Sequence, residues 1–451
     1  MPAFRETYRG SVAAWECDQY GHYNVQFYVG RISDAAASLL HAGGLGRIGL
    51  EQRRLGIVAV NQNIDYLREL RAGSVIRMES AIKAVEGRKL VLHHRLFDAE
   101  SGELAMRADV LGLCFDLEAR KSVPLPDDLR QGFAGLLLNG EEALVQQAVP
   151  EAEPGWMMSH RSPVNAWECD RMGHLNVQFY LARAADADRH VFTALGLGPR
   201  ALAALGLALR PQRYRIQFRR ELHNAAITVM RSAIRSADAE GVTLLHELHD
   251  FETGVLSAVV EARLTVEELA SGRQAALPAA AQRLAEPWVA AFPGGPPLPP
   301  AGSPPPPLSL RDGMYETCRG GVDQWECDEN GRMATRFYMA RFSSAAMNVF
   351  VAADFDTSRM REAGLGSAAL DYIIDIKQMM RVGQAFHCQT GVLELRDKTW
   401  RFGHLLLDSN SGETLATAEV VAVFFDLKTR KAITMPEPVR AGFTRHLLPP
   451  V

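Results

Sequence analysis

A seven-residue motif that combines an aspartate, a glycine, a histidine and an asparagine occurs twice in this chain of 451 residues. It reads Asp-x-x-Gly-His-x-Asn at residues 18–24 and again at residues 170–176. A carboxylate can attack an electrophilic carbon directly or take a proton from water. Unpaired N–H groups at the start of a helix can stabilise the negative charge that develops in such a reaction. If a helix follows it, the motif joins a candidate catalytic group to a candidate oxyanion contact.

A third copy of the motif, at residues 328–334, is altered. All three copies directly follow the sequence Trp-Glu-Cys. The third copy keeps its aspartate, Asp328, but carries Arg332 in place of the histidine and Ala334 in place of the asparagine. Because two chemically useful residue types are lost together, we predict that the third copy does not catalyse a reaction.

The repetition extends far beyond the motif. Residues of copy one recur 152 positions later in copy two and 310 positions later in copy three, as His94, His246 and His404 illustrate. Solenoid repeats are roughly 20–50 residues long, so a period of this length indicates tandem globular domains instead. At about 150 residues per domain, the length of the chain also predicts three domains.

Each copy predicts a strand, a turn and one long helix, followed by four or five strands. In copy one the strand covers residues 9–17 and the turn residues 18–23, and a helical stripe of apolar residues begins at Val25. Asn24 lies where a helix N-cap belongs. Further strands are expected at residues 57–66, 74–85, 90–97 and 104–115. The expected fold class is α+β, with three tandem domains in which a curved antiparallel sheet wraps around one long central helix.

The junctions between the copies differ in composition. The expected segments are domain one at residues 1–145, domain two at 152–285, a proline-rich linker at 286–312 and domain three at 313–451. Residues 130–158 predict a helical tail and a turn, whereas Pro293 to Pro307 has the composition of an extended, solvated spacer. This spacer would let copy three lie apart from the other two.

The overall composition is that of an ordinary soluble protein, with 47% hydrophobic and 23% charged residues. A formal net charge of −4 argues against nucleic acid or an anionic membrane as the main partner. No apolar run reaches the roughly 18 residues of a spanning helix, and no signal-peptide pattern opens the chain, so we expect a cytoplasmic protein. The six cysteines show no metal-ligand spacing, and neither a metal nor a cofactor is expected.

The motif at a strand-to-helix junction resembles that of the hot-dog fold, and most closely the acyl-CoA thioesterase branch related to 4-hydroxybenzoyl-CoA thioesterase. The resemblance spans all three copies. It implies hydrolysis of an acyl-CoA or related thioester, with Asp18 and Asp170 as nucleophile or general base. It also implies an oxyanion contact from the backbone at the helix starts near Val25 and Val177. The candidate site residues are Asp18, Asp170, His22, His174, Asn24 and Asn176, with Gly21, Gly173, Val25, Val177, Glu69 and Glu221 around the substrate.

Several of these residues have a simpler alternative role. The aspartate could merely hold a turn, and the histidine could orient that turn without moving a proton. Cys17, beside the aspartate, could be a thiol nucleophile or a small buried hydrophobe. Glu69 and Glu221 are replaced by Met379 in copy three, which favours a place in the site over an exposed strand charge.

Other recurring residues favour structure over chemistry. The tyrosines on the core-facing stripe of the helix are expected to pack in the core, and the histidines in the middle of a strand to be hydrogen-bonded structural residues. These are Tyr28, Tyr180, Tyr338, His94, His246 and His404. The basic pairs at residues 88–89, 120–121 and 430–431 could meet CoA phosphates or be solvated turn residues.

Two function classes remain open from the sequence: a thioester hydrolase, and a hot-dog protein that binds an acyl or aromatic ligand or acts as a lyase or isomerase. Paired hot-dog domains bury a strand edge that would otherwise be exposed. We expect copies one and two to pair within the chain and copy three to pair with copy three of a second chain. The product would be a homodimer of six hot-dog units.

Overall fold

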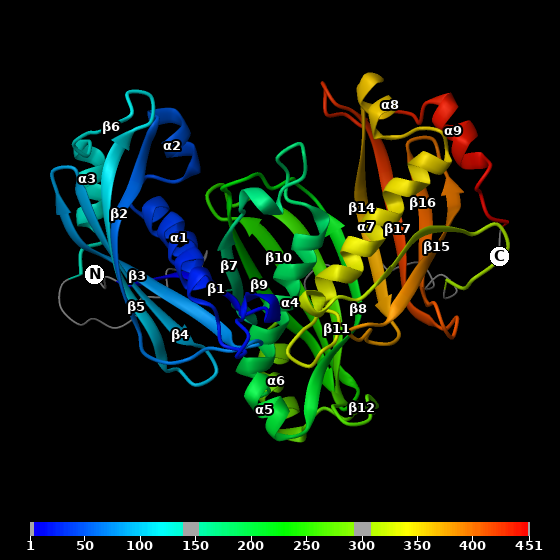
Figure 1. Ribbon diagram of the computed structural model, residues 1–451, viewed down its shortest axis with the longest axis horizontal. Coiled ribbons are helices and arrows are strands. Elements are labelled where there is room, and N and C mark those ends of the chain that lie inside the picture. Colours follow the sequence, from blue (N-terminus) through cyan, green and yellow to red (C-terminus); the bar gives the residue numbers. More distant parts are fainter. Residues whose placement is uncertain (1–3, 139–152, 293–307, 450–451) are drawn as a thin grey trace.

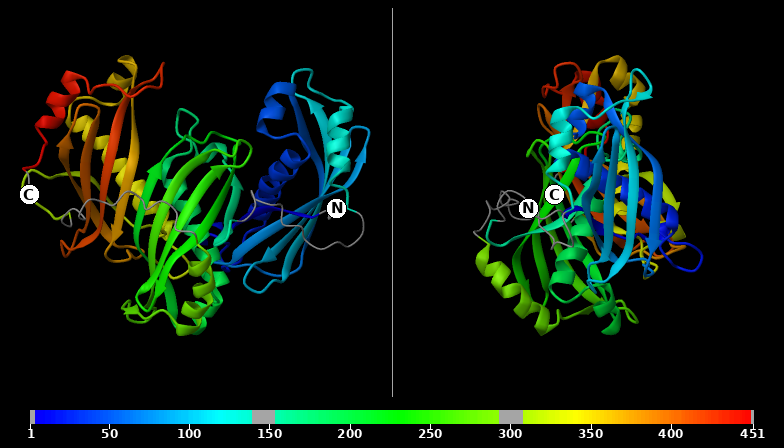
Figure 2. Two further views of the ribbon diagram at one scale, coloured as in Figure 1. Left: turned by 180° about the vertical axis from the view of Figure 1, so that it is seen from behind. Right: turned by 90° about the vertical axis from the view of Figure 1, so that its left-hand side faces the viewer.

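The computed structural model describes residues 4–138, 153–292 and 308–449. They form three similar units in a row, with the second unit in the middle (Figures 1 and 2). The predicted helical tail and proline-rich spacer fall largely on residues 139–152 and 293–307, outside the described residues. Within the described ranges, none of the helices combines the length and apolar character needed to cross a bilayer.

The three units repeat one order of elements, except that the described residues of unit three form no short strand between the last long strand and the last helix. Unit one contains β1 (Arg5–Ser11), α1 (Val25–Ala42), α2 (Arg47–Arg53), β2 (Leu55–Tyr66), β3 (Val75–Glu86), β4 (Lys89–Asp98), β5 (Leu104–Asp116), β6 (Lys121–Ser122) and α3 (Asp127–Ala134). Unit two contains β7 (Trp156–Pro163), α4 (Val177–Ala194), α5 (Pro199–Ala204), β8 (Leu207–Phe218), β9 (Ile227–Asp238), β10 (Gly241–Asp250), β11 (Leu256–Glu268), β12 (Gln274–Ala275) and α6 (Ala279–Ala291). Unit three contains β13 (Tyr315–Gly321), α7 (Thr335–Ala352), α8 (Thr357–Glu362), β14 (Leu365–Ile376), β15 (Ala385–Leu395), β16 (Thr399–Asp408), β17 (Thr414–Asp426) and α9 (Glu437–Thr444).

Each unit has an 18-residue helix packed against an antiparallel sheet. In unit one the strands lie in the order β1-β3-β4-β5-β2, so the first two strands of the sequence form the two edges. Helix α1 buries a stripe that includes Tyr28, Ile32 and Leu39, spaced as an amphipathic helix requires. The helix begins at Val25, as predicted, because Asn24 caps it.

Two local expectations were wrong. The first strand ends at Ser11 and not at residue 17, because the side chain of Glu16 accepts the N–H of Ala13 at 3.0 Å and closes a 3₁₀ turn. Each unit also carries shorter helices besides the long one. In unit one, α2 begins after Gly46, between the long helix and the strand that follows it.

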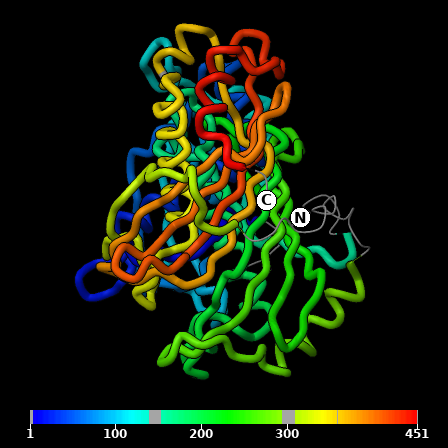
Figure 3. Tube along the Cα trace, turned by 90° about the vertical axis from the view of Figure 1, so that its right-hand side faces the viewer, coloured from blue at the N-terminus to red at the C-terminus, as the bar shows by residue number. Residues whose placement is uncertain are grey.

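The units join through different sheet edges. The first and second meet at β1 and β7, where Arg9 pairs with Arg161. The second and third meet at β8 and β14, where residues 213–217 pair with residues 371–375. At the second junction α4 packs against α7, and the two units share one buried hydrophobic cluster, whereas unit one has its own. Figure 3 shows the third unit lying against the second.

The second junction differs from the expected arrangement. The third unit does not lie apart from the other two, because its β14 edge pairs with β8 of the second. The first and second units do pair within the chain, as expected, and they do so through β1 and β7. Helix α6 also continues through Ala291, beyond the expected end of domain two at residue 285.

Candidate functional site

The aspartate of the first motif is fixed by the backbone of its own turn. One carboxylate oxygen of Asp18 accepts the N–H groups of Tyr20 and His22, at 2.9 and 3.0 Å. The turn also places Gly21 at a φ of 77°, which glycine adopts without strain. The hydrogen bond from the His22 N–H lowers the pKa of Asp18, so the side chain is a stable carboxylate at neutral pH.

Helix α1 starts a few residues after this carboxylate in the sequence. Asn24 caps the helix because its side-chain oxygen accepts the N–H of Gln26 at 3.1 Å. No backbone acceptor for the N–H of Val25 is found among the described residues, and Val25 is 59% exposed. The Val25 N–H is therefore a donor available to a bound molecule.

His22 faces the end of β2 and not Asp18. Its Nε2 atom lies 3.3 Å from a carboxylate oxygen of Glu69 and 2.9 Å from the guanidinium of Arg71. Glu69 also lies 3.5 Å from Arg71. This geometry agrees with an orienting histidine, since its hydrogen-bonding group is engaged with the neighbouring loop.

A pocket of about 370 Å³ opens at this point in unit one. Asp18, His22, Asn24 and Val25 line one side, and residues 66–70 at the end of β2 line the other. The fold therefore gathers the candidate residues of the first copy, Glu69 included, around one concave surface. Gly21 does not line the pocket and acts in the turn.

The second copy repeats the turn and the helix cap. Asp170 accepts the N–H groups of Met172 and His174 at 2.8 and 3.0 Å. Asn176 caps α4 by accepting the N–H of Gln178 at 3.2 Å. Gly173 has a φ of 78°. The turn chemistry of the two copies is therefore the same.

The surroundings of the second motif differ from those of the first. His174 lies 3.4 Å from Glu221, and His223 occupies the position of the arginine in copy one. The ligand atoms of these three side chains lie within 4.8 Å of one another, a spacing that could accommodate a metal ion. Linear spacing could not predict this group, because the fold brings it together from separate segments. Arg430 of the third unit already forms an ion pair with Glu221.

The aspartate of the third copy is neutralised. One oxygen of Asp328 accepts the N–H groups of Asn330 and Arg332, and the other lies 3.0 Å from the Arg332 guanidinium. Arg332 also lies 2.7 Å from Glu267 of the second unit. Helix α7 has no side-chain cap at Ala334. Both carboxylate oxygens are thus occupied.

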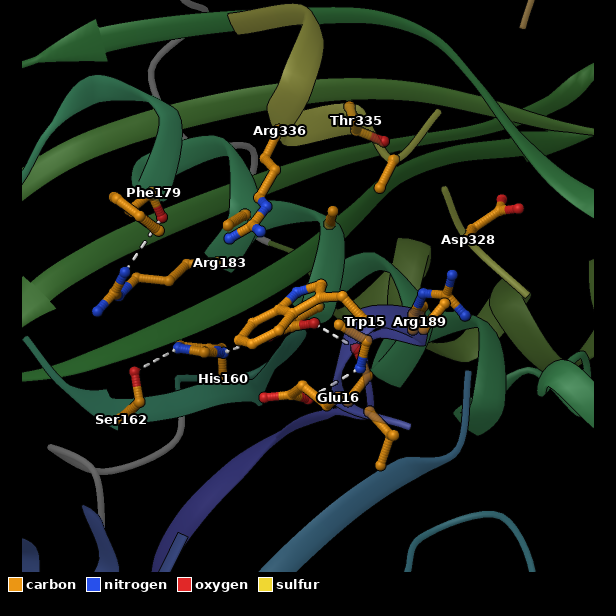
Figure 4. Close-up of a pocket in the computed structure, with 18 of the residues that line it drawn as sticks. Trp15, Glu16, His160, Ser162, Phe179, Arg183, Arg189, Asp328, Thr335 and Arg336 are labelled. Atoms are coloured by element: carbon orange, nitrogen blue, oxygen red, sulfur yellow. Dashed lines mark hydrogen bonds and ion pairs between the residues drawn. The ribbon is translucent and has the colours of Figure 1, made fainter. Parts of the chain in front are cut away.

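A larger cavity of about 650 Å³ lies where the three units meet. Figure 4 shows Trp15, Arg183 and Arg336, one from each unit, beside it. The guanidinium of Arg336 lies 5.7 Å from the centre of the Trp15 ring. Asp186 also lines the cavity, and burial raises the pKa of its carboxyl group to about 6. No pattern in the sequence predicts this cavity, because it exists only between units.

The remaining candidates have structural roles. Burial raises the pKa of Cys17, which makes its thiol a poor nucleophile at neutral pH. The three strand histidines are fully buried and hydrogen-bonded to a hydroxyl at 2.6–2.7 Å, as predicted. Among the described residues, however, the second ring nitrogen, Nε2, of His94 and of His404 has no hydrogen-bond partner. The three helix tyrosines are also buried in the core.

Comparison with known proteins shows that all three units match the same protein family. The profile of the thioesterase-like superfamily matches three times, at residues 12–133, 164–290 and 322–443. Comparison with curated protein sequences gives no significant match.

Similar solved structures include a putative oleoyl thioesterase from Lactobacillus plantarum, 14% identical with a TM-score of 0.48, where the alignment covers 63% of this chain and 99% of that one. The 12:0-ACP thioesterase from Umbellularia californica is 11% identical with a TM-score of 0.47 over 60% and 95% of the two chains. A hypothetical protein from Staphylococcus aureus in complex with CoA is 20% identical with a TM-score of 0.29 over 33% and 98%.

Proposed function

The chain belongs to the thioesterase-like superfamily, and we propose that it hydrolyses an acyl-CoA or related thioester to a free acid and a thiol. The first two units supply the active sites. The third serves the architecture of the chain. The proposed domains are residues 1–145, 152–291 and 313–451. They follow the expected boundaries except at α6.

One observation carries this proposal: a fixed carboxylate and an available helix N–H lie on the same pocket in unit one. Asp18 and the first residue of α1, Val25, both line the 370 Å³ pocket. A thioester needs an attacking oxygen and stabilisation of the oxyanion, and its thiolate leaves without a strong acid. The positive end of the helix dipole adds to the oxyanion contact.

The lowered pKa of Asp18 keeps its carboxylate ionised, as both the nucleophilic and the general-base role require, and we propose the nucleophilic route. In the proposed reaction a carboxylate oxygen attacks the thioester carbonyl carbon. The tetrahedral intermediate collapses with loss of the thiolate and leaves a mixed anhydride on the aspartate. Water then attacks the anhydride, releases the acid and restores the carboxylate. Asp170 takes the same role in unit two.

The neighbouring residues position these two groups. Asn24 and Asn176 hold the first turn of each helix, so that Val25 and Val177 present their N–H groups. His22 and His174, held by Glu69 and Glu221, keep the turn in place. The glycines at 21 and 173 supply the left-handed residue of the turn.

The alternative is a hot-dog protein that binds an acyl or aromatic ligand, or a lyase or isomerase, without thioester hydrolysis. Release of free thiol from a panel of short, long and aromatic acyl-CoA substrates separates the two classes. We expect thiol release well above the uncatalysed rate for at least one member of the panel. Binding of these compounds without thiol release would favour the alternative.

We also propose that the protein assembles as a homodimer.

A further inference from the structure

We propose that the second unit binds one divalent transition-metal ion of the zinc class through His174, Glu221 and His223. His174 belongs to the turn of the second motif, and the other two residues follow β8, which ends at Phe218. The ligand atoms of the three side chains lie within 4.8 Å of one another. This inference goes beyond the proposed function and does not depend on it, because metal binding can be measured without a substrate.

The geometry of the three side chains is close to that of a tetrahedral site. Zinc ligands lie about 2.0–2.1 Å from the ion, so neighbouring ligand atoms of a tetrahedral site are about 3.4 Å apart. The Nε2 atom of His174 already lies 3.4 Å from a carboxylate oxygen of Glu221. The ring centres of His174 and His223 are 4.9 Å apart, with the ring planes at 76°. Rotation of the exposed His223 side chain would bring its nitrogen to the ion.

The two imidazole rings are held near each other but are not engaged elsewhere. The backbones of His174 and His223 pair as an antiparallel bridge, which fixes the separation of the two residues. Among the described residues, the only polar partner of the His174 ring is Glu221, and the His223 ring has none. The nitrogens are therefore free to bind an ion on a backbone that is already in place.

Arg430 of the third unit holds the carboxylate without taking the oxygen that faces His174. Its guanidinium forms an ion pair with Oε1 of Glu221, whereas Oε2 is the oxygen that lies 3.4 Å from His174. A carboxylate that binds a metal is commonly oriented by a further partner of this kind. The charge of Arg430 opposes a bound cation. Its side chain is 37% exposed and that of Glu221 is 42% exposed, so solvent screens the repulsion.

The ligand types select the class of metal ion. Two imidazoles and one carboxylate suit Zn²⁺, Co²⁺ or Ni²⁺, whereas Mg²⁺ and Ca²⁺ prefer sites made entirely of oxygen atoms. Three protein ligands leave the fourth position of a tetrahedral zinc ion to water.

The first unit shows the same arrangement without the third ligand. Arg71 aligns with His223 and lies 2.9 Å from Nε2 of His22 and 3.5 Å from a carboxylate oxygen of Glu69. A guanidinium cannot bind a metal ion, and its permanent charge lies where the ion would be. The third unit retains none of the three ligands, since it carries Arg332, Met379 and Arg381 at these positions. Only the second unit therefore has the complete set.

A bound ion would join the turn of the second motif to the loop that follows β8. The N–H of His174 donates to the carboxylate of Asp170 at 3.0 Å, so the ion would restrain the same turn that orients this aspartate. No such restraint would act on the turn at residues 18–24.

Calorimetric titration of the untagged full-length protein with Zn²⁺, after treatment with a chelator, tests the site. We expect one tight site per chain and no binding of Mg²⁺ at the same concentration. His223→Arg, which installs the residue of the first unit, should weaken Zn²⁺ binding at least about a hundredfold, because loss of a residue that merely supports a ligand already costs about 10–100-fold. Glu221→Gln should weaken it at least about tenfold.

A second histidine provides the matched control. His249 lies 3.2 Å from Glu247 but has no third ligand beside it among the described residues, so His249→Gln should leave Zn²⁺ binding unchanged. In the opposite direction, Arg71→His should raise the number of Zn²⁺ ions bound per chain from one to two. An unchanged affinity in His223→Arg, or a loss in His249→Gln as large as in His223→Arg, would overturn the proposal. Failure of Arg71→His to add an ion would contradict the deciding role of this position.

Hydrogen exchange measured with and without Zn²⁺ locates the ion. In the wild type Zn²⁺ should slow the exchange of amides at residues 170–176 and leave residues 18–24 unchanged, and His223→Arg should abolish the effect. Slower exchange at both turns, or at neither, would contradict a site confined to the second unit. Absence of thiol release in the wild type would contradict the proposed function and leave these binding measurements unaffected.

Discussion

The guanidinium of Arg332 lies 3.0 Å from the carboxylate of Asp328 in the third unit, where the first two units carry a histidine. The same arginine reaches Glu267 of the second unit and is only 4% exposed. The substitution therefore converts a candidate catalytic residue into part of a buried ion-pair network between two units. It connects the proposed loss of catalysis in unit three with a contact to unit two.

Asp328→Asn should leave thiol release unchanged and destabilise the protein. The variant keeps the hydrogen bonds to the turn but removes one negative charge beside the buried Arg332, which keeps its ion pair with Glu267. Loss of one partner in a buried network costs about 1–3 kcal/mol in the free energy of unfolding. Chemical denaturation and the acyl-CoA assay measure the two effects. A marked loss of turnover without a loss of stability would assign catalysis to the third unit.

Asn24→Ala should cost about 1 kcal/mol of stability through the lost helix cap, and should lower turnover at the first site. Asn24→Asp provides the matched control. Aspartate is an equally good cap and suits the helix dipole, yet its charge opposes an oxyanion near the Val25 N–H. We expect wild-type stability and reduced kcat for Asn24→Asp in an Asp170→Asn background. Equal turnover in that variant and its parent would argue against an oxyanion at this helix end.

The pH profile of the first site should show whether the aspartate or the histidine acts. The pKa of Asp18 is lowered by the hydrogen bond from the His22 N–H, so its carboxylate stays ionised below the ordinary aspartate value of about 3.9. In an Asp170→Asn background, kcat/KM should therefore hold level from neutral pH down to the limit of the folded protein. A fall of kcat/KM on the acidic side of neutral pH would instead contradict a mechanism that rests on the Asp18 carboxylate alone.

Buried histidines should make the protein less stable in acid. Burial lowers the pKa of His94 and of His404 to about 3, below the value of about 6.5 expected in the unfolded chain. The unfolded state therefore binds these protons first. The stabilisation is complete above about pH 6.5 and is lost progressively as the pH falls toward 3, at about 1.4 kcal/mol per pH unit for each histidine.

His94→Gln should remove one of the two buried histidines that make the stability of the protein depend on pH. Urea unfolding at pH 7, 6 and 5 should show a shallower pH dependence for the variant than for the wild type, although the variant is less stable at pH 7 because the hydrogen bond to Ser80 changes. Parallel slopes in the two proteins would mean that His94 does not titrate in the expected range.

The local structure around the motif could be predicted from the sequence because local interactions determine it. Asn24 as the cap and the apolar stripe from Val25 define the start of α1. The end of the first strand was wrong because a single contact, from Glu16 to the Ala13 N–H, closes the chain into a turn. Glu69 could be identified as a candidate because the third repeat carries Met379 at the aligned position.

The relations between units could not be predicted. The edges β2, β8 and β14 are similar strands, and which of them pair depends on side-chain fit over the whole interface. The contact of Arg430 with Glu221 and the cavity beside Trp15 and Arg336 exist only after the units have assembled. No spacing within one copy carries that information.

The most direct test of the proposed mechanism is thiol release from the preferred acyl-CoA substrate by the Asp18→Asn, Asp170→Asn double variant. Each single variant should retain the activity of the other site, and the loss should appear in kcat more than in KM, because asparagine keeps the shape of the side chain. The double variant should fall to the uncatalysed rate while it keeps the wild-type circular dichroism spectrum. Turnover in a folded double variant close to that of the wild type would contradict the carboxylate mechanism.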